Sequence, residues 1–259
     1  MFDAKKNPRT RYKVPAVEQS SRVLFTLADT QSSHLSLNEI CAKAGLHKSR
    51  AFAILETLQT FGLVQRNCDG QGYALGPALI SLSRKVLDDM SPARLAEPIL
   101  KDLAKKTGST AILGLIAGSQ VFVAAKHEGE GNIGLTMRIG HRLPLTYGAH
   151  GKAIAAHLLH EDLDGLLQEG DNRFYGDPAK FDRERLNDDL EKCRSVGFAE
   201  DLGQASQGLN VVAAPVLDAR RIPIGYIEIF VLFSSKEAHR FGPVVAKSAS
   251  ELSRLLGSD

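Results

Sequence analysis

The first 61 residues contain three segments whose apolar positions recur near the 3.6-residue period of an α-helix. The first segment spans residues 16–30. The second follows Ser36, which forms a capping-box pattern with Glu39, and Gly45 ends it because glycine readily adopts a positive φ. The third spans residues 48–61. Its inward positions follow an i, i+3, i+4, i+7 spacing and are Ala51, Ile54, Leu55 and Leu58.

The next segment has the pattern of a β-hairpin. Residues 63–66 and 73–75 are two short extended runs that flank an Asp69-Gly70 turn. Three helices with a tight glycine turn between the second and the third, followed by a hairpin, are typical of a winged helix-turn-helix. We therefore predict a DNA-binding domain over residues 14–76.

The remaining chain predicts a linker helix and a second domain. Residues 77–90 have helical spacing, and Ser91-Pro92 interrupts it, so the second domain is placed at residues 91–259. Antiparallel strands with helices on one side would give that domain an α+β core. Strands are expected at 111–117, 121–127, 209–218 and 224–233, and helices at 95–106, 149–159, 161–168, 181–196 and 241–256.

Composition narrows the class of protein. A chain of 259 residues is long enough for two ordinary domains, and it contains no run of 18 apolar residues that could cross a membrane. The polar, basic residues 1–13 do not resemble a secretory signal. The cysteines Cys41, Cys68 and Cys193 are odd in number and scattered, which indicates a reducing compartment. We therefore expect a cytoplasmic protein that does not bind a membrane.

The charge is distributed unevenly. The first 75 residues contain ten Lys and Arg against six Asp and Glu, a net charge of +4, whereas the whole chain carries +2. Residues 1–13 form a basic arm that either contacts DNA phosphates or is a solvated, disordered tail. The basic residues of this arm are Lys5, Lys6, Arg9, Arg11 and Lys13.

The third helix is the candidate for reading DNA, because a recognition helix needs polar side chains near its N-terminus. Ser49 and Arg50 can reach base edges, Lys48 can neutralise a phosphate, and Phe52 can contact a thymine methyl group. Arg66 in the hairpin either contacts DNA or is merely exposed. The full set of predicted DNA-binding residues is Arg22, Lys48, Ser49, Arg50, Phe52, Ala53, Thr57 and Arg66.

Other chemistry-bearing patterns are weak. The segment 148–152 opens a helix with glycines, which suits either an anion at the helix N-terminus or close helix–sheet packing. His157 and His160 share a helical face, but a zinc site needs three or four converging ligands, so surface histidines are the preferred interpretation. The sequence shows no nucleophile elbow, paired-carboxylate signature or HExxH motif. We expect no metal, no cofactor and no enzyme activity.

An ordered set of short motifs resembles the IclR family of bacterial regulators. The resemblance covers about residues 14 to 257, and its motifs are specific as a series although each is weak alone. The motifs are Val17-Glu18, Arg22-Val23-Leu24, Leu37-Asn38-Glu39-Ile40, Gly45-Leu46-His47-Lys48-Ser49, Tyr73-Ala74-Leu75-Gly76, Leu143-Pro144-Leu145, Gly151-Lys152-Ala153, Gly197-Phe198-Ala199, Gly208-Leu209 and Ala213-Ala214-Pro215-Val216.

The resemblance implies a multidomain α/β protein with a winged helix-turn-helix, a linker helix and a GAF-like α+β effector-binding domain with an antiparallel sheet. It implies a homodimer or homotetramer that binds a palindromic double-stranded DNA operator. It also implies a small-molecule effector, an organic acid or an aromatic metabolite. Carried over by position, the effector pocket contains Leu135, Leu143, Ala149, His150, Asp201, Leu209, Val211, Glu228 and Phe230, with Tyr147 beside them.

Some positions depart from the family pattern. Members that bind very small keto acids have small hydroxyl residues where this chain has Glu228 and Phe230, and His150 replaces a small residue. These departures argue against a glyoxylate-like ligand and favour a larger, aromatic one. A carboxylate effector would also meet Asp201 and Glu228 unfavourably unless one of them is protonated or water intervenes.

Two other function classes are compatible with parts of the pattern. One is an enzyme that converts a metabolite and carries an accessory DNA-binding head. The other is an architectural DNA-binding module without a ligand. The main prediction is a ligand-responsive, DNA-binding transcriptional regulator.

Overall fold

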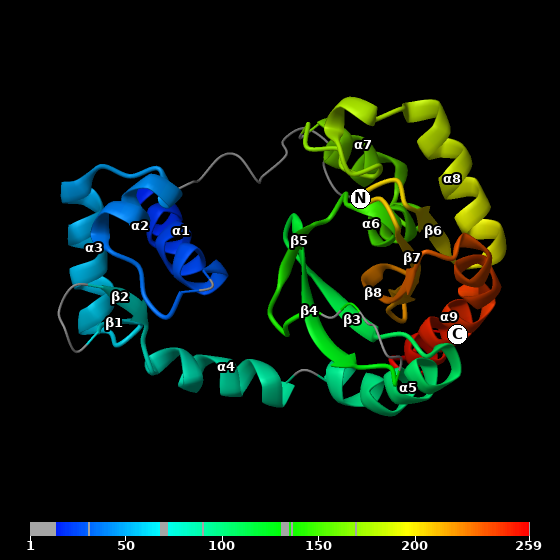
Figure 1. Cartoon of the computed structure of the whole chain (residues 1–259), viewed down its shortest axis with the longest axis horizontal. Helices are drawn as coiled ribbons and strands as arrows, with labels where there is room; N and C mark the ends of the chain where they lie inside the picture. Colours follow the sequence, from blue (N-terminus) through cyan, green and yellow to red (C-terminus); the bar gives the residue numbers. More distant parts are fainter. Residues whose placement is uncertain are drawn as a thin grey trace. The chain divides into compact units, whose positions relative to one another are not determined.

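The computed structural model describes residues 14–30, 32–67, 72–89, 91–130, 135, 137–168 and 170–258 (Figure 1). The predicted basic arm, the Asp69-Gly70 turn and Cys68 lie outside these residues. The chain divides into two compact units, Met1–Asp89 and Met90–Asp259. Within the described part, no helix has both the length and the apolar character needed to cross a membrane.

The first unit contains the three predicted helices and the hairpin. The helices are α1 (Pro15–Asp29), α2 (Leu37–Ala44) and α3 (Lys48–Thr60). Strands β1 (Val64–Arg66) and β2 (Tyr73–Leu75) pair antiparallel, and α4 (Ala78–Asp89) follows them. One apolar core joins α1, α2, α3 and the hairpin; its buried members include Val23, Leu27, Leu35, Ile40, Ile54, Leu55, Leu58, Val64 and Tyr73.

The predicted capping box at the start of α2 is present. The Glu39 N–H donates to the Ser36 hydroxyl at 3.3 Å, and the Ser36 N–H donates to the Glu39 carboxylate at 2.8 Å. The Ser36 hydroxyl also donates to the Glu39 carboxylate at 2.7 Å, and this bond, followed by the bond from the Ser36 N–H, holds the pKa of Glu39 below its usual value. Gly45 ends α2 with a φ of +66°. Two sequence signals therefore set the length of the helix that precedes α3.

Replacing Ser36 with Ala is expected to lower the free energy of unfolding by about 1 kcal/mol, because the N-terminus of α2 loses its side-chain acceptor. Ser20→Ala is the matched control, since the Ser20 hydroxyl bonds only to the carbonyl of Ala16 on its own helix. Chemical denaturation measures both variants. An equal, small effect of the two substitutions would contradict the prediction.

The second unit is built on a six-stranded antiparallel sheet with the strand order β5-β4-β3-β8-β7-β6. All four predicted strands are present, and two short ones were not predicted, β5 and β6. The elements are α5 (Ser91–Thr107), β3 (Ala111–Ala117), β4 (Gln120–His127), β5 (Arg142–Pro144), α6 (Gly148–Ala155), α7 (His160–Gln168), a 3₁₀ turn (Pro178–Lys180), α8 (Arg183–Val196), β6 (Ala199–Leu202), β7 (Leu209–Leu217), β8 (Pro223–Leu232) and α9 (Ser235–Leu255).

Helices cover both faces of this sheet, so the expectation of helices on one side was wrong. Helices α5 and α9 pack on one face, and α6 packs on the other with α7 and α8 beyond it (Figure 1). Nearly every residue of β7 and β8 is buried, as in strands that are covered on both sides. The sequences of β7 and β8 already show this, because they are nearly continuous apolar runs, whereas a strand with one solvent-exposed face alternates apolar and polar residues.

Several boundaries also differ from expectation. Helix α5 begins at Ser91, where an interruption was predicted, because a proline in the first helical turn lacks only an N–H that has no helical partner. Helix α9 begins six residues earlier than predicted, at Ser235, and the Ser234 hydroxyl caps it by accepting from the Glu237 N–H. Helix α6 ends at Ala155, four residues short of the predicted end.

Candidate DNA-interface and ligand cavity

Helix α3 has one buried face and one exposed face. Ala51, Ile54, Leu55 and Leu58 are buried in the core of the first unit. All six residues that were predicted to read DNA from this helix are exposed: Lys48, Ser49, Arg50, Phe52, Ala53 and Thr57. Phe52 is 44% exposed, so its ring is accessible to a partner outside its own unit.

The two other predicted DNA contacts lie on neighbouring elements. Arg22 on α1 forms an exposed ion pair with Glu18 at 2.6 Å. Arg66 on β1 forms an ion pair with Glu56 of α3 at 2.9 Å and donates to the Tyr73 hydroxyl at 3.0 Å. Exposed pairs of this kind contribute at most about 1 kcal/mol, so either arginine can exchange its carboxylate for a phosphate. The link from Arg66 to α3 was not predicted.

The second unit contains a cavity of about 110 Å³ between α6 and the sheet. It brings together nine of the ten residues predicted for the effector pocket: Leu143, Tyr147, Ala149, His150, Asp201, Leu209, Val211, Glu228 and Phe230. Leu135 is not among the lining residues and packs against the adjacent apolar cluster. Sequence reasoning missed four lining residues, Met137, Gly148, Ala205 and Ser206.

The strand register explains why residues far apart in sequence meet at this cavity. Val211 of β7 lies opposite Phe230 of β8, and Glu228 lies two positions along β8, so their side chains share one face of the sheet. The N-terminus of α6 supplies Ala149 and His150 from above that face. The opposite face of the same strands belongs to the core under α5 and α9.

Glu228 and His150 form a buried acid–base pair at the cavity wall. Glu228 is 1% exposed and His150 is 2% exposed. The His150 Nδ1 atom lies 3.4 Å from the Glu228 Oε2 atom, while Nε2 lies 3.2 Å from the Pro144 carbonyl oxygen. The imidazole stacks on Tyr226, with 4.6 Å between the ring centroids. Burial and the nearby Glu228 carboxyl raise the pKa of the Tyr226 phenol well above its usual value.

Asp201 is the second carboxylate at the cavity, and its own loop holds it. Its carboxylate accepts hydrogen bonds from the backbone N–H of Gln204 at 2.7 Å and from that of Ala205 at 3.2 Å. Burial, and next the charge of Asp201, raise the pKa of the Tyr147 phenol. Asp201 is therefore held in place by hydrogen-bond donors, whereas Glu228 Oε2 has none among the described residues.

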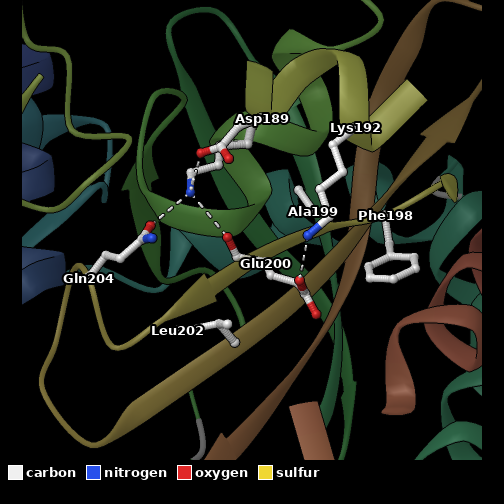
Figure 2. Close-up of a pocket in the computed structure, with 8 residues that line it drawn as sticks. Asp189, Lys192, Phe198, Ala199, Glu200, Leu202 and Gln204 are labelled. Atoms are coloured by element: carbon white, nitrogen blue, oxygen red, sulfur yellow. Dashed lines mark hydrogen bonds and ion pairs between the residues drawn. The ribbon is translucent and has the colours of Figure 1, made fainter. Parts of the chain in front are cut away.

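A buried lysine anchors the segment that carries Asp201. The Lys152 ammonium lies 3.0 Å from the Asp189 carboxylate and donates to the Glu200 carbonyl at 3.1 Å and to the Gln204 side chain at 2.8 Å. Figure 2 shows Asp189, Glu200 and Gln204 converging on this point. These contacts tie β6 and its following loop to α6 and α8. Lys152 does not line the cavity that contains Glu228.

Replacing Lys152 with Met is expected to flatten the pH dependence of unfolding just below the ordinary lysine pKa of about 10. Burial, opposed by Asp189, lowers the pKa of Lys152 in the folded protein. Between the folded and unfolded pKa values the unfolded chain binds more protons, so stability rises with pH there, by at most about 1.4 kcal/mol per pH unit. The variant lacks this contribution.

Denaturant titrations at several pH values check this expectation, with Lys192→Met as the control. The Lys192 side chain is 57% exposed and pairs with the Glu200 carboxylate at 3.3 Å (Figure 2). The titration stops near pH 10 because tyrosines ionise above it. Identical slopes for the wild type and Lys152→Met would contradict the predicted pH dependence.

The glycines of segment 148–152 serve close packing at one position. A Cβ on Gly151 would lie 2.6 Å from the carbonyl carbon of Thr146, so only glycine lets α6 approach that backbone. The two histidines with helical spacing do not converge on a ligand set. His160 is exposed beside Asp164, and His157 contacts the Ala153 carbonyl. Among the described residues, no group of three His, Cys, Asp or Glu side chains could hold a metal ion.

Family models match both parts of the chain. The model for the C-terminal part of the bacterial transcriptional regulator IclR matches residues 84–254, and the model for the IclR helix-turn-helix domain matches residues 16–67. Together they cover most of the chain.

Full-length relatives and solved structures agree with these matches. The chain is 29% identical to the HTH-type transcriptional regulator XynR of Escherichia coli over 94% of this chain and 98% of that protein. It is 28% identical to the glycerol operon regulatory protein of Streptomyces coelicolor over 83% and 84% of the two chains.

The crystal structure of an IclR transcriptional regulator from Alicyclobacillus acidocaldarius superposes with a TM-score of 0.80 at 25% identity. The match covers 95% of this chain and 100% of that one. An IclR homologue from Microbacterium hydrocarbonoxydans, crystallised with 4-hydroxybenzoate, has the same fold, with a TM-score of 0.73 at 17% identity over 93% and 98% of the chains.

These matches decide between the function classes. The relatives are named transcriptional regulators and not enzymes, so they do not support an enzyme with an accessory DNA-binding head. The N-terminal helix-turn-helix and the C-terminal α+β domain with its antiparallel sheet are both confirmed. The chain belongs to the IclR family of bacterial transcriptional regulators, which bind DNA through an N-terminal helix-turn-helix and carry a C-terminal effector domain.

Proposed function

We propose that this regulator binds a double-stranded operator through the exposed face of α3 and responds to a small molecule bound in the cavity between α6 and the sheet. The observation that carries the proposal is that one chain combines an exposed recognition-type helix with a largely apolar cavity in its second unit. The domain assignment follows: a basic arm at 1–13, a DNA-binding domain at 14–76, a linker helix at 77–90 and an effector domain at 91–259.

A homodimer or homotetramer is the form expected to act on the operator. A palindromic operator presents two half-sites, and a two-fold symmetric protein places one recognition helix at each. Effector binding changes operator affinity only if the ligand binds one arrangement of the DNA-binding domains more tightly than another. The protein would carry out this function in the cytoplasm.

The effector is proposed to be a small organic acid or aromatic metabolite. The related protein from Microbacterium hydrocarbonoxydans was crystallised with 4-hydroxybenzoate, which belongs to both classes. In the present chain, the apolar side chains of Leu143, Leu209 and Phe230 provide a wall against which a ring or aliphatic body can pack. An architectural module without a ligand would not need such a cavity.

The test is a footprint of the full chain on the DNA beside its own gene, at low and at physiological salt. Protection of a palindromic site is expected, with affinity falling as salt rises because lysines and arginines release counterions from phosphates. Metabolites that raise the melting temperature of the protein should also change the footprint. Absence of a footprint at low salt would count against the proposal, and a footprint that no stabilising metabolite changes would favour the architectural module.

A further inference from the structure

One carboxylate oxygen at the cavity wall lacks a hydrogen-bond donor among the described residues. Glu228 is 1% exposed, and its Oε2 atom makes no hydrogen bond. The His150 Nδ1 atom lies 3.4 Å from this oxygen, which is long for a hydrogen bond, and the two atoms form none. Burying a carboxylate without a hydrogen-bond donor costs more free energy than burying an unpaired neutral polar group. A donor placed at this oxygen would therefore stabilise the protein.

The described part of the cavity wall offers Glu228 no lysine or arginine, and the nearby Lys152 is bound to Asp189, Glu200 and Gln204. The hydroxyl-bearing residues Tyr147 and Ser206 also line the cavity, but Glu228 Oε2 accepts a hydrogen bond from neither. The second carboxylate, Asp201, already accepts hydrogen bonds from its own loop. The rest of the wall is largely apolar, with Met137, Leu143, Leu209, Val211 and Phe230. Among the buried side-chain atoms that lack a hydrogen-bond partner in the described part of the chain, Glu228 Oε2 is the one that belongs to a residue lining this cavity.

We infer that the ligand of this cavity donates a hydrogen bond to Glu228 through a hydroxyl or amine group, with its apolar body against Leu209 and Phe230. This inference rests on the proposed effector site and specifies the chemistry of its ligand. A ligand carboxylate at Glu228 would place two negative charges in a buried space, which is strongly unfavourable. If the ligand carries a carboxylate, that group must lie in the cavity away from Glu228. An acid that has no hydroxyl or amine group is expected not to bind.

Matched probes test the inference on the full chain. The set is 4-hydroxybenzoate, its methyl ether 4-methoxybenzoate and unsubstituted benzoate, together with phenol, anisole and toluene. A hydrogen bond to a charged acceptor corresponds to about 10–100-fold in affinity. Calorimetric titration should therefore show each hydroxy compound binding about 10–100-fold more tightly than its methyl ether or its parent compound.

Two variants assign this preference to Glu228. Glu228→Met, which keeps the length of the side chain without its charge, should reduce the preference to about threefold or less. Glu228→Gln keeps an uncharged acceptor and should give an intermediate preference. Glu251→Gln, at an exposed position of α9 away from the cavity, should leave the preference unchanged. Glu228→Gln also covers the case in which Glu228→Met fails to fold. An intermediate preference in the glutamine variant would then assign the preference to the hydrogen bond at position 228.

The outcomes separate this inference from the proposed function. Equal binding of hydroxy compounds and methyl ethers would overturn it, as expected if a trapped water satisfies Glu228. The inference would also be overturned if the preference for hydroxy compounds survived in Glu228→Met. It would be overturned as well if neither 4-hydroxybenzoate nor phenol bound to the protein. In each of these cases the proposed function still stands if another metabolite changes the operator footprint, and it fails only if none does.

Discussion

Replacing Arg50 with Ala is expected to weaken operator binding by about 10–100-fold and to relax sequence preference at the base pairs that it contacts. Arg50 lies in the first turn of α3, is exposed, and forms no ion pair within the described residues. An arginine at this place can form two hydrogen bonds to a guanine edge in the major groove, and alanine forms none. Fluorescence anisotropy with operator variants measures both the affinity and the preference.

Lys48 and Gln59 provide the comparisons for Arg50. Lys48→Ala should weaken binding to all sequences by a similar factor and reduce the salt dependence by about one charge, as expected for a phosphate contact. Gln59→Ala changes an exposed residue at the far end of α3 and should leave affinity unchanged. If Arg50→Ala kept both the affinity and the sequence preference of the wild type, the placement of the recognition surface would be wrong.

Replacing Gly151 with Ala is expected to lower the free energy of unfolding by about 3 kcal/mol and to disturb the ligand cavity. A Cβ at this position would lie 2.6 Å from the Thr146 carbonyl carbon and 3.0 Å from the Leu145 carbonyl oxygen. Both are backbone atoms that cannot rotate away, so α6 must move. Ala149 and His150 would move with it, because they lie on the same helix and line the cavity.

Gly165→Ala is the matched control for this substitution. Gly165 lies in α7, and a Cβ there would meet no atom within 4 Å. Alanine should therefore raise stability by about 0.5–1 kcal/mol through its higher helix propensity and the smaller conformational freedom of the unfolded chain. Hydrogen exchange of the α6 and α7 amides reports each change locally in this two-unit chain. A stabilising effect of Gly151→Ala would show that α6 has room to accommodate a side chain.

Local sequence signals predicted the first unit well because its elements are set by neighbours in sequence. The Ser36–Glu39 capping box, Gly45 and the apolar spacing of α3 each act over one or two helical turns. The strands of the second unit were also visible as apolar runs. The short strands β5 and β6 were missed, because three or four residues without a clear alternation carry too little pattern.

The candidate cavity was predicted by the resemblance to the IclR family and not by periodicity or spacing. That resemblance named eight of the lining residues, including His150, Asp201 and Glu228, and Tyr147 was expected beside them. It could not show that Glu228 Oε2 has no donor among the described residues while Asp201 is satisfied. This difference depends on the loop that follows β6, whose backbone N–H groups turn toward Asp201 alone.

By itself, the sequence determined the helix-turn-helix, its exposed reading face and the antiparallel α+β character of the second unit, because propensities, caps and apolar periods act locally. Only the tertiary structure decided which side chains meet. Lys152, Asp189, Glu200 and Gln204 come from α6, α8, β6 and the following loop, and no local pattern connects them. The same holds for His150 and Glu228. Their separation of 3.4 Å follows from the strand order and from the close approach of α6 to the sheet, which are properties of the packed domain.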